Sequence, residues 1–338
     1  MGIVITPTEP DNDQNFWIDI LDVGHGSCVV ISNGTSTILV DAGPGSPILE
    51  YMREQNIYEI ETAVISHADQ DHIGGLIAII DSGIPVHNIY CNGDAAKSSK
   101  MWKALVYSLD DLQRRGVTAV LFEAVEGADF KSPFEQVEIE VIAPRYRLSR
   151  LGAGSTDKAG LAISTNSVSV VIRVLVDGKP LLLLPGDLDY VGFSHLSDSG
   201  VDIQADYLVL PHHGGMLGSR SVTDTMVKAL CTSVSPKQIF VSNGRTRFDN
   251  PQPGVVGAIR QELPTVQIAC TQLSRRCAPE EVVSRNDIPI YSAGAARGLC
   301  CAGSLRLTPS DGITVEKDLS DHAAFVDSHA PTALCRLL

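Results

Sequence analysis

Four potential metal ligands lie within six consecutive residues, and this cluster constrains the chain more than any other feature of its sequence. The ligands are His67, Asp69, Asp71 and His72, and they follow the apolar run TAVIS directly. A strand that ends in a tight loop can point the first two ligands one way and the last two another, because Asp71 can start the helix that carries His72. A capped, solvated loop is the alternative, but capping alone rarely brings mixed His and Asp together at this density. We therefore predict two adjacent cation sites.

The ligand types indicate which ions such sites would hold. Imidazole nitrogens and carboxylate oxygens without a thiolate suit Zn²⁺, Mn²⁺ or Fe²⁺, and a carboxylate-rich set favours the harder ions. A bound ion of this kind lowers the pKa of its water toward about 7, so that the water can attack an ester or phosphodiester at neutral pH. Asp71 is the expected catalytic partner of that water. The predicted activity is metal-dependent hydrolysis.

Short apolar runs alternate with amphipathic stretches along the chain, which predicts an α/β fold. The expected strands are IDILDV, CVVI, TILVDAG, TAVISH, VEIEVIAP, YLVLP, QIFVS and VQIAC, and the expected helices span residues 47–55, 98–115, 222–230 and 254–262. The run SVSVVIRVLV is separated from LLLLP by an Asp-Gly pair, which is typical of a β-hairpin. Two strand-rich halves therefore emerge.

Residues 271–303 differ from the rest because they are rich in Arg, Cys and Gly. They separate two expected strands, VQIAC and SLRLT, as an insertion into a hairpin would. Four cysteines flank the insertion and are candidates for a structural zinc site, although their spacing lacks a CxxC knuckle: Cys270, Cys277, Cys300 and Cys301. We divide the chain into a catalytic domain over residues 1–270, the insertion, and a final strand with a tail over residues 304–338.

Charge and composition limit which partners and which cellular location we expect for the chain. The formal net charge of −14 argues against a protein that wraps nucleic acid through a broad basic surface, but it leaves room for a local basic cleft. Residues 1–15 have no basic and apolar signal pattern, and no window approaches the roughly 20 apolar residues needed to span a bilayer. We expect a cytoplasmic protein without a membrane partner and with its eight cysteines reduced.

Five ordered motifs resemble the metallo-β-lactamase superfamily, whose signature is His-x-His-x-Asp-His. The first cluster is accompanied by Leu21-Asp22-Val23-Gly24-His25-Gly26, Val40-Asp41-Ala42-Gly43, Leu184-Pro185-Gly186-Asp187-Leu188 and Leu210-Pro211-His212-His213-Gly214. Asp69 stands at the second histidine position, as in the soluble hydrolase domain of the ComEC-like branch of DNA-uptake proteins. The resemblance implies a four-layer αββα sandwich, here with a Cys-containing C-terminal extension.

The resemblance also implies a set of ligands for two divalent ions, zinc or manganese. Asp187 would bridge the ions, and His212 or His213 would complete the second site with Asp71 and His72. Asp41 would not contact an ion itself but would orient one of the ligands. Where the superfamily usually has a further histidine, this chain has a stretch from Asn166 to Ser169, and we place both of these residues around the ligands. The first site, His67, Asp69 and Asp187, is then short of nitrogen, so one ion can be held more tightly than the other.

Several positions depart from the pattern or carry weaker signals. Asn250 stands in place of the histidine of a His-Pro pair, which puts proton donation to a leaving group in doubt. His25 replaces a frequent glutamine and is a candidate proton carrier or substrate contact, or else a turn histidine bonded to the backbone. Arg245 and Arg247 can hold phosphate through forked hydrogen bonds, or can be solvated surface arginines.

Three functions follow from these observations. The first is a phosphodiesterase, a nuclease that acts on DNA through a metal-activated water. The second is hydrolysis of a small ester, lactone or cyclic nucleotide, which the acidic net charge permits more comfortably. The third is a metal-stabilised, non-catalytic subunit that works with a partner protein from a neighbouring gene, for instance in bacterial defence.

Overall fold

The computed structural model describes residues 16–121, 124–280, 283–285, 287–308 and 319–336. The segment 1–15, on which the expected lack of a signal rests, and parts of the expected tail lie outside these residues.

Within the described residues the chain forms two sheets. The first has seven strands in the order β13-β1-β2-β3-β4-β5-β6. Its strands are β1 (Trp17–Ile20), β2 (Val29–Ser32), β3 (Thr37–Val40), β4 (Ile60–Val64), β5 (Val86–Tyr90), β6 (Ala119–Leu121) and β13 (Leu305–Leu307).

The second sheet has six strands in the order β12-β11-β10-β9-β8-β7. Its strands are β7 (Val137–Ala143), β8 (Val171–Val176), β9 (Lys179–Leu184), β10 (Tyr207–Val209), β11 (Gln238–Val241) and β12 (Gln267–Cys270). The predicted hairpin joins β8 to β9, with Val176 opposite Lys179. Asp177 and Gly178 have φ of +50° and +71°, as a two-residue turn that follows the strand twist requires.

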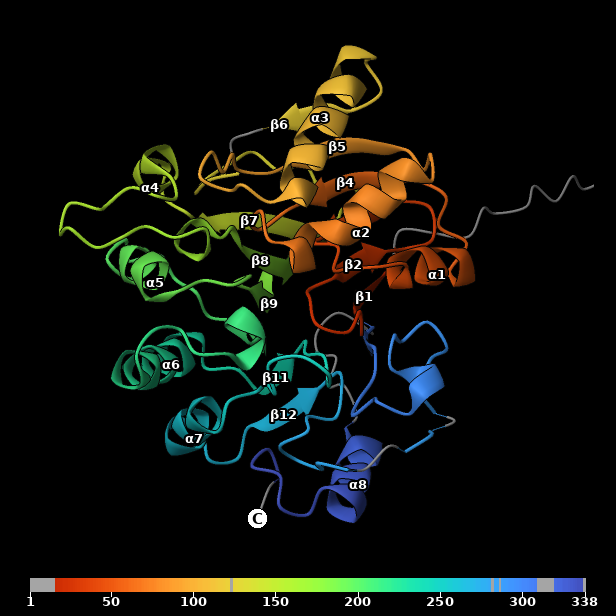
Figure 1. The fold of residues 1–338 in the computed structure, drawn as a ribbon, viewed down its shortest axis with the longest axis vertical. Coiled ribbons are helices and arrows are strands. Elements are labelled where there is room, and N and C mark those ends of the chain that lie inside the picture. Colours follow the sequence, from red (N-terminus) through yellow and green to blue (C-terminus); the bar gives the residue numbers. More distant parts are fainter. Residues whose placement is uncertain (1–15, 122–123, 281–282, 286, 309–318, 337–338) are drawn as a thin grey trace, which may run out of the picture.

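Helices cover the outer face of each sheet and complete the predicted four-layer αββα sandwich (Figure 1). The helices are α1 (Pro47–Glu54), α2 (Gln70–Asp81), α3 (Lys100–Arg114), α4 (Tyr146–Leu151), α5 (Tyr190–Ser197), α6 (Arg220–Val234), α7 (Pro253–Glu262) and α8 (Ser320–His329). One apolar core lies between the two sheets, a second between the first sheet and α1, α2 and α3, and a third between the second sheet and α5, α6, α7 and α8. Burial on both faces explains why the central strands are almost continuously apolar.

Parallel strands bring distant loops to one edge of the sandwich. Strands β3 and β4 run parallel in the first sheet, and β9, β10 and β11 run parallel in the second. The carboxyl ends of parallel strands meet at the same edge, and ligand sites in α/β folds lie there. The residues that directly follow these strands are Asp41, the His67 cluster, the loop with Asp187, the His212-His213 pair and Ser242.

The expected pairing of VQIAC with SLRLT in one hairpin is wrong, although an isolated antiparallel bridge joins Gln272 to Cys300 near the two ends of the intervening segment. Strand β12 is the edge of the second sheet, whereas β13 pairs with β1 in the first sheet, so the intervening segment crosses from one sheet to the other. Both strands have the short apolar pattern that hairpin partners have, and only their pairing distinguishes the two topologies.

Each helix in the described part of the chain is too short or too polar to cross a membrane.

Candidate metal centre

The cluster predicted from the sequence lies in the loop between β4 and α2. The helix begins at Gln70 with Asp69 at the N-cap position, one residue earlier than a start at Asp71 would place it. Gly75 lets this helix pack closely, since a Cβ there would come within 2.8 Å of the Gly43 carbonyl oxygen. The helix therefore presents Asp71 and His72 beside the loop that follows β3.

Two groups of side chains bring ligand atoms within 4.8 Å of one another. The inner group is His67, His72 and Asp187, all three buried. Nε2 of His72 lies 3.2 Å from Oδ1 of Asp187, and Nε2 of His67 lies 3.8 Å from the other oxygen, Oδ2. Asp187 thus offers one oxygen to each histidine, as an ion-bridging carboxylate must.

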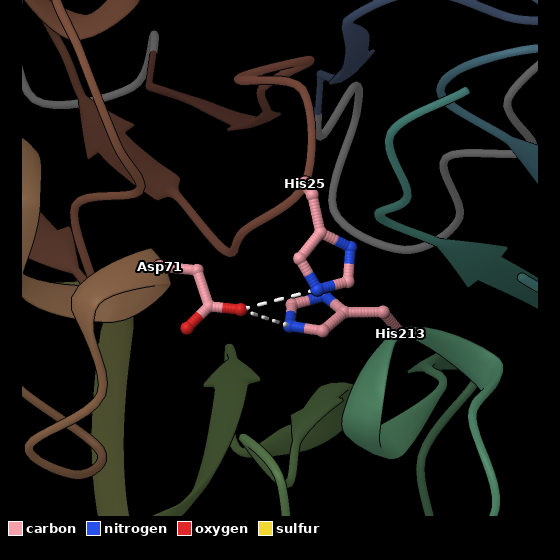
Figure 2. Close-up of side chains that lie close together, drawn as sticks. All are labelled: His25, Asp71 and His213. Atoms are coloured by element: carbon pink, nitrogen blue, oxygen red, sulfur yellow. Dashed lines mark ion pairs between the residues drawn. The ribbon is translucent and has the colours of Figure 1, made fainter. Parts of the chain in front are cut away.

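The outer group is His25, Asp71 and His213, which converge from three separate segments (Figure 2). Oδ2 of Asp71 lies 3.2 Å from Nε2 of His25 and 3.6 Å from Nε2 of His213. His213 also joins the outer group to the inner one, because its Nε2 lies 3.5 Å from Oδ1 of Asp187.

Unpartnered polar atoms show that these side chains suit a cation. Nε2 of His67, Nε2 of His72, Nε2 of His213 and Oδ1 of Asp187 are buried without a hydrogen-bond partner. A buried polar atom without a partner costs about 1–3 kcal/mol, so four of them at one point require an explanation. Imidazole nitrogen and carboxylate oxygen are the usual ligands of zinc and manganese, so the donor set fits a divalent ion.

Residues behind the ligands orient the imidazole rings. Oδ2 of Asp41 lies 2.7 Å from Nδ1 of His72, and Asp41 also accepts hydrogen bonds from the Ser66 backbone and hydroxyl. Nδ1 of His213 donates to the carbonyl of Ser242 at 2.8 Å. Each of these bonds keeps the proton on Nδ1 and leaves Nε2 free for an ion.

The sequence left open which residue of the His212-His213 pair faces the second site, and the structure distinguishes them. Both have left-handed backbone conformations, with φ of +52° and +55°. The side chain of His213 is 5% exposed and reaches Asp71, whereas that of His212 is 36% exposed. Nδ1 of His212 lies 3.0 Å from Oδ2 of Asp187 and 3.2 Å from the Asn166 amide. His212 is therefore on the first-site side, at the rim.

Ser169 contacts the backbone of Asp187, whereas Asn250 contacts Gln252. The hydroxyl of Ser169 accepts from the backbone N–H of Asp187 at 3.1 Å, which holds the strand end that carries the carboxylate. Asn250 is buried, and its side-chain oxygen accepts from the Gln252 amide at 3.1 Å. Its amide nitrogen lies near Gly215, beside the turn that holds His212.

Burial and charge set the protonation of the ligands. Burial, helped by the charge of His72, lowers the pKa of His67 to about 3, and burial lowers the pKa of His213 to about 4. For His72 burial acts in the same direction, but the Asp187 and Asp41 carboxylates outweigh it and hold the pKa well above its usual value. Burial raises the pKa of Asp187, yet the neighbouring histidines hold it well below the usual range. The centre therefore combines ionised carboxylates with neutral imidazoles at His67 and His213, whereas the flanking carboxylates favour the protonated form of His72.

Lys97 contacts the centre and was missed in the sequence. Its ammonium group pairs with Oδ1 of Asp69, the carboxylate expected in the first site. The other oxygen of Asp69 lies 3.7 Å from Nε2 of His67. Lys97 lies in the loop before α3, far from any recognisable motif, so no local signal identifies it.

The two candidate phosphate-binding arginines differ in position. The prediction that Arg245 faces the site is wrong, because its guanidinium is buried and donates to the backbone carbonyls of Leu273, Ala278 and Pro279. Arg247 is exposed, and its guanidinium lies 4.7 Å over the ring of Phe248. That ring is 60% exposed and packs 4.8 Å from the ring of His25. Arg247 and Phe248 therefore form an exposed rim next to the outer group.

The four cysteines expected to bind zinc do not all face one another. The Cys300 thiol donates to Asp22, whereas Sγ of Cys301 lies 3.2 Å from Nε2 of His322. Cys277 and Cys335 pack against the core that contains Cys270 and Cys301. Burial and the neighbouring thiols, with that of Cys335 foremost among them, raise the pKa of Cys270 well above its usual value. The structure thus removes Cys300 from the set and places Cys335 near the other three; in the described residues, neither group with ligand atoms within 4.8 Å includes a cysteine.

More than half of the chain matches a known protein family. Residues 21–229 match the sequence model of the metallo-beta-lactamase superfamily. The chain is 24% identical over 257 residues to the competence protein ComA of Neisseria gonorrhoeae, which covers 74% of this chain and 30% of that protein. It thus spans less than a third of the length of this relative.

Two solved structures are similar to the chain at low sequence identity. The metallo-beta-lactamase fold protein YhfI of Bacillus subtilis is 11% identical with a TM-score of 0.45, over 75% of this chain and 96% of that chain. Igni18, a metallo hydrolase of the archaeon Ignicoccus hospitalis, is 16% identical with a TM-score of 0.40, over 75% of this chain and 94% of that chain.

Proposed function

The chain belongs to the metallo-beta-lactamase superfamily of metal-dependent hydrolases, and we propose that it is a phosphodiesterase that cleaves DNA. The observation that carries the proposal is that Asp187, a member of the inner group, also contacts His213 of the outer group. One oxygen of Asp187 faces His72 and His213, and the other faces His67 and His212. A carboxylate shared in this way suits two adjacent divalent ions, zinc or manganese.

The chain's own residues have separable roles in this proposal. His67, His72, His213, Asp71 and Asp187 would hold the ions, with Asp69 as a further carboxylate ligand. When bound, such ions supply a nucleophile at neutral pH and neutralise charge on the reacting group. Asp71 has its pKa held well below the usual value by His25 and nearby imidazoles, although burial opposes this, so it stays ionised and can orient a water.

Two observations favour a nucleic-acid substrate. The chain is similar to a competence protein, and its Asp69 matches the ComEC-like branch. Phe248 offers an exposed aromatic face beside the centre, and Arg247 adds a positive charge there. Aromatic rings stack on bases and arginine binds phosphate, so this rim can hold a single strand. The overall charge of −14 disfavours binding over a wider surface.

The test is cleavage of single-stranded DNA, double-stranded DNA and bis-p-nitrophenyl phosphate by metal-stripped protein refilled with Mn²⁺ or Zn²⁺. We expect cleavage that disappears in Asp71→Ala and persists in Asp110→Ala, a matched change on the surface of α3. Asp110 is a suitable control because it is exposed and pairs only with Arg114 within its own helix in the described structure.

The remaining outcomes identify the alternatives. Turnover of small esters, lactones or cyclic nucleotides without DNA cleavage would assign the chain to a small-molecule hydrolase, which the acidic net charge accommodates. Absence of both activities under either metal would favour a non-catalytic, partner-dependent subunit. Binding of the metal would remain in both cases, since it depends on the ligands alone.

A further inference from the structure

His25 is held firmly at the metal centre by the backbone around it. The turn Gly24-His25-Gly26 uses left-handed backbone at both glycines, with φ of +80° and +153°. The next residue, Ser27, donates its backbone N–H to the Asp71 carbonyl at 3.1 Å, and the Ser242 hydroxyl donates to the Gly26 carbonyl at 2.6 Å. The turn is thus tied to the outer group from both sheets.

Close packing fixes the imidazole as well. A Cβ at Gly244 would come within 2.4 Å of the His25 backbone nitrogen, so only glycine allows the turn to approach this closely. The His25 ring lies between the rings of His213, at 4.5 Å, and Phe248, at 4.8 Å. Its side chain is 8% exposed, and Nε2 points at Asp71 (Figure 2).

The distances within the outer group suit ligands of one ion. Ligands about 2.0–2.1 Å from a tetrahedral zinc ion lie roughly 3.3 Å apart. From His25 the successive ligand separations are 3.2 Å to Asp71, 3.6 Å on to His213, 3.5 Å on to Asp187 and 3.2 Å on to His72. The ligand atoms of His25, Asp71 and His213 all lie within 4.8 Å of one another, as ligands of a single ion do, and Asp187 adjoins them through His213.

The protonation of His25 permits this role. Its Nδ1 is buried without a hydrogen-bond partner in the described structure, unlike Nδ1 of His72 and His213. With the proton on Nδ1, the Nε2 lone pair faces the Asp71 carboxylate, and only a cation between them makes that arrangement favourable. With the proton on Nε2, His25 instead donates to Asp71. Nδ1 lacks a partner in both forms, so the contact with Asp71 is what distinguishes them.

We propose that His25 is a protein ligand of the ion in the second site, together with His72, His213, Asp71 and Asp187. The second site then has three imidazole ligands. The first has the buried His67, with the partly exposed His212 beside it, and carboxylates, of which Asp69 is already paired with Lys97. Nitrogen-rich sites bind zinc more tightly than carboxylate-rich sites do. One ion is therefore held tightly at the second site and the other weakly.

The experiment titrates metal-stripped protein with Co²⁺ and records both the dissociation constant and the visible ligand-field spectrum. The proteins are the wild type, His25→Ala, His25→Gln, and His87→Ala as a control. His87 is a suitable control because it is exposed and pairs with Glu59 on the surface. We expect the wild type and the control to bind one equivalent of Co²⁺ tightly. In His25→Ala the affinity for this equivalent should fall by about 10–100-fold, and the visible spectrum should change.

A glutamine at position 25 can reach Asp71 as a hydrogen-bond donor but is a poor ligand. It therefore separates the two protonation schemes. Unchanged Co²⁺ affinity and spectrum in both His25 variants would overturn the proposal and leave His25 as a donor to Asp71.

X-ray absorption of the wild type with one equivalent of Zn²⁺ gives a readout that needs no variant to fold. Three imidazoles are expected, and two would overturn the proposal. The inference rests on the proposed function only in requiring a divalent ion. If His25→Ala loses Co²⁺ affinity and the wild type cleaves no substrate, His25 is a ligand and the proposed phosphodiesterase activity is refuted. If the wild type cleaves DNA and His25→Ala binds Co²⁺ as tightly as the wild type, the activity stands and the ligand role of His25 is refuted.

Discussion

His72 lies between two carboxylates, with Nδ1 2.7 Å from Asp41 and Nε2 3.2 Å from Asp187. The first contact sets the tautomer and the second belongs to the metal centre. This relationship makes Asp41 a positioning residue whose effect should appear in metal affinity as well as in activity.

We expect Asp41→Asn to weaken metal binding by about 10–100-fold, because the amide cannot accept from His72 and Ser66 at both positions. The measurement is the dissociation constant for Zn²⁺ by competition with a chelating dye. Asp110→Asn is the matched surface control. Equal affinities in both variants would contradict a positioning role for Asp41.

The pair His212-His213 provides a test of site assignment. We expect His213→Gln to abolish hydrolysis, because its Nε2 faces Asp71 and Asp187, and His212→Gln to lower it by less than about tenfold, because His212 lies at the rim. Metal content after dialysis, measured by mass spectrometry, should fall only in His213→Gln. The opposite ranking would assign the second site to His212.

Lys97 should limit occupancy of the first site. Its ammonium pairs with Asp69, so Lys97→Met should release that carboxylate and tighten binding of a second equivalent of Mn²⁺ by about tenfold, or about 1.4 kcal/mol. Isothermal titration would measure this, with the exposed Lys103→Met as the control. A weaker or unchanged second equivalent would show that Lys97 supports the site instead.

Phe248 should affect the binding of DNA but not the chemical step. We expect Phe248→Ala to raise KM for single-stranded DNA by about 5–100-fold, since base stacking on an aromatic ring contributes about 1–3 kcal/mol. KM for bis-p-nitrophenyl phosphate should change less, because its two nitrophenyl rings offer less stacking surface than the successive bases of a DNA strand. Tyr107→Ala, an exposed aromatic on α3, is the control. Equal effects on both substrates would indicate that Phe248 acts by packing against His25 and not by stacking on a base.

His322 should make stability depend on pH. Burial, with the charge of Arg285, lowers its pKa to about 4 from an ordinary value of about 6.5. The folded chain therefore holds His322 neutral while the unfolded chain binds a proton, so its contribution is present above pH 6.5 and is lost as pH falls from 6.5 toward 4.

In urea unfolding between pH 7 and 4.5, the free energy of unfolding of the wild type should decline more than that of His322→Gln, by on the order of 3 kcal/mol. His87→Gln, on the surface, should decline as the wild type does. Parallel declines in all three proteins would contradict a neutral buried His322.

Local patterns predicted much of the fold. The alternation of apolar runs with amphipathic stretches predicted most of the elements, and the Asp-Gly pair predicted the β8–β9 hairpin. These features depend on neighbours a few residues apart. The pairing of β12 and β13 in separate sheets was not predictable in this way, because an edge strand has the same sequence pattern whichever sheet it joins.

The density of His and Asp between β4 and α2 was enough to predict a metal centre, since those residue types bind ions wherever the loop lies. Only the tertiary structure decided that His213 faces Asp71, that Arg245 is buried, that Lys97 pairs with Asp69, and that Cys335 replaces Cys300 near Cys270. Each of these depends on which way a side chain leaves its element and on what packs against it from a distant segment. A sequence determines the chemistry that its residues can perform, and long-range packing determines which of them come together to perform it.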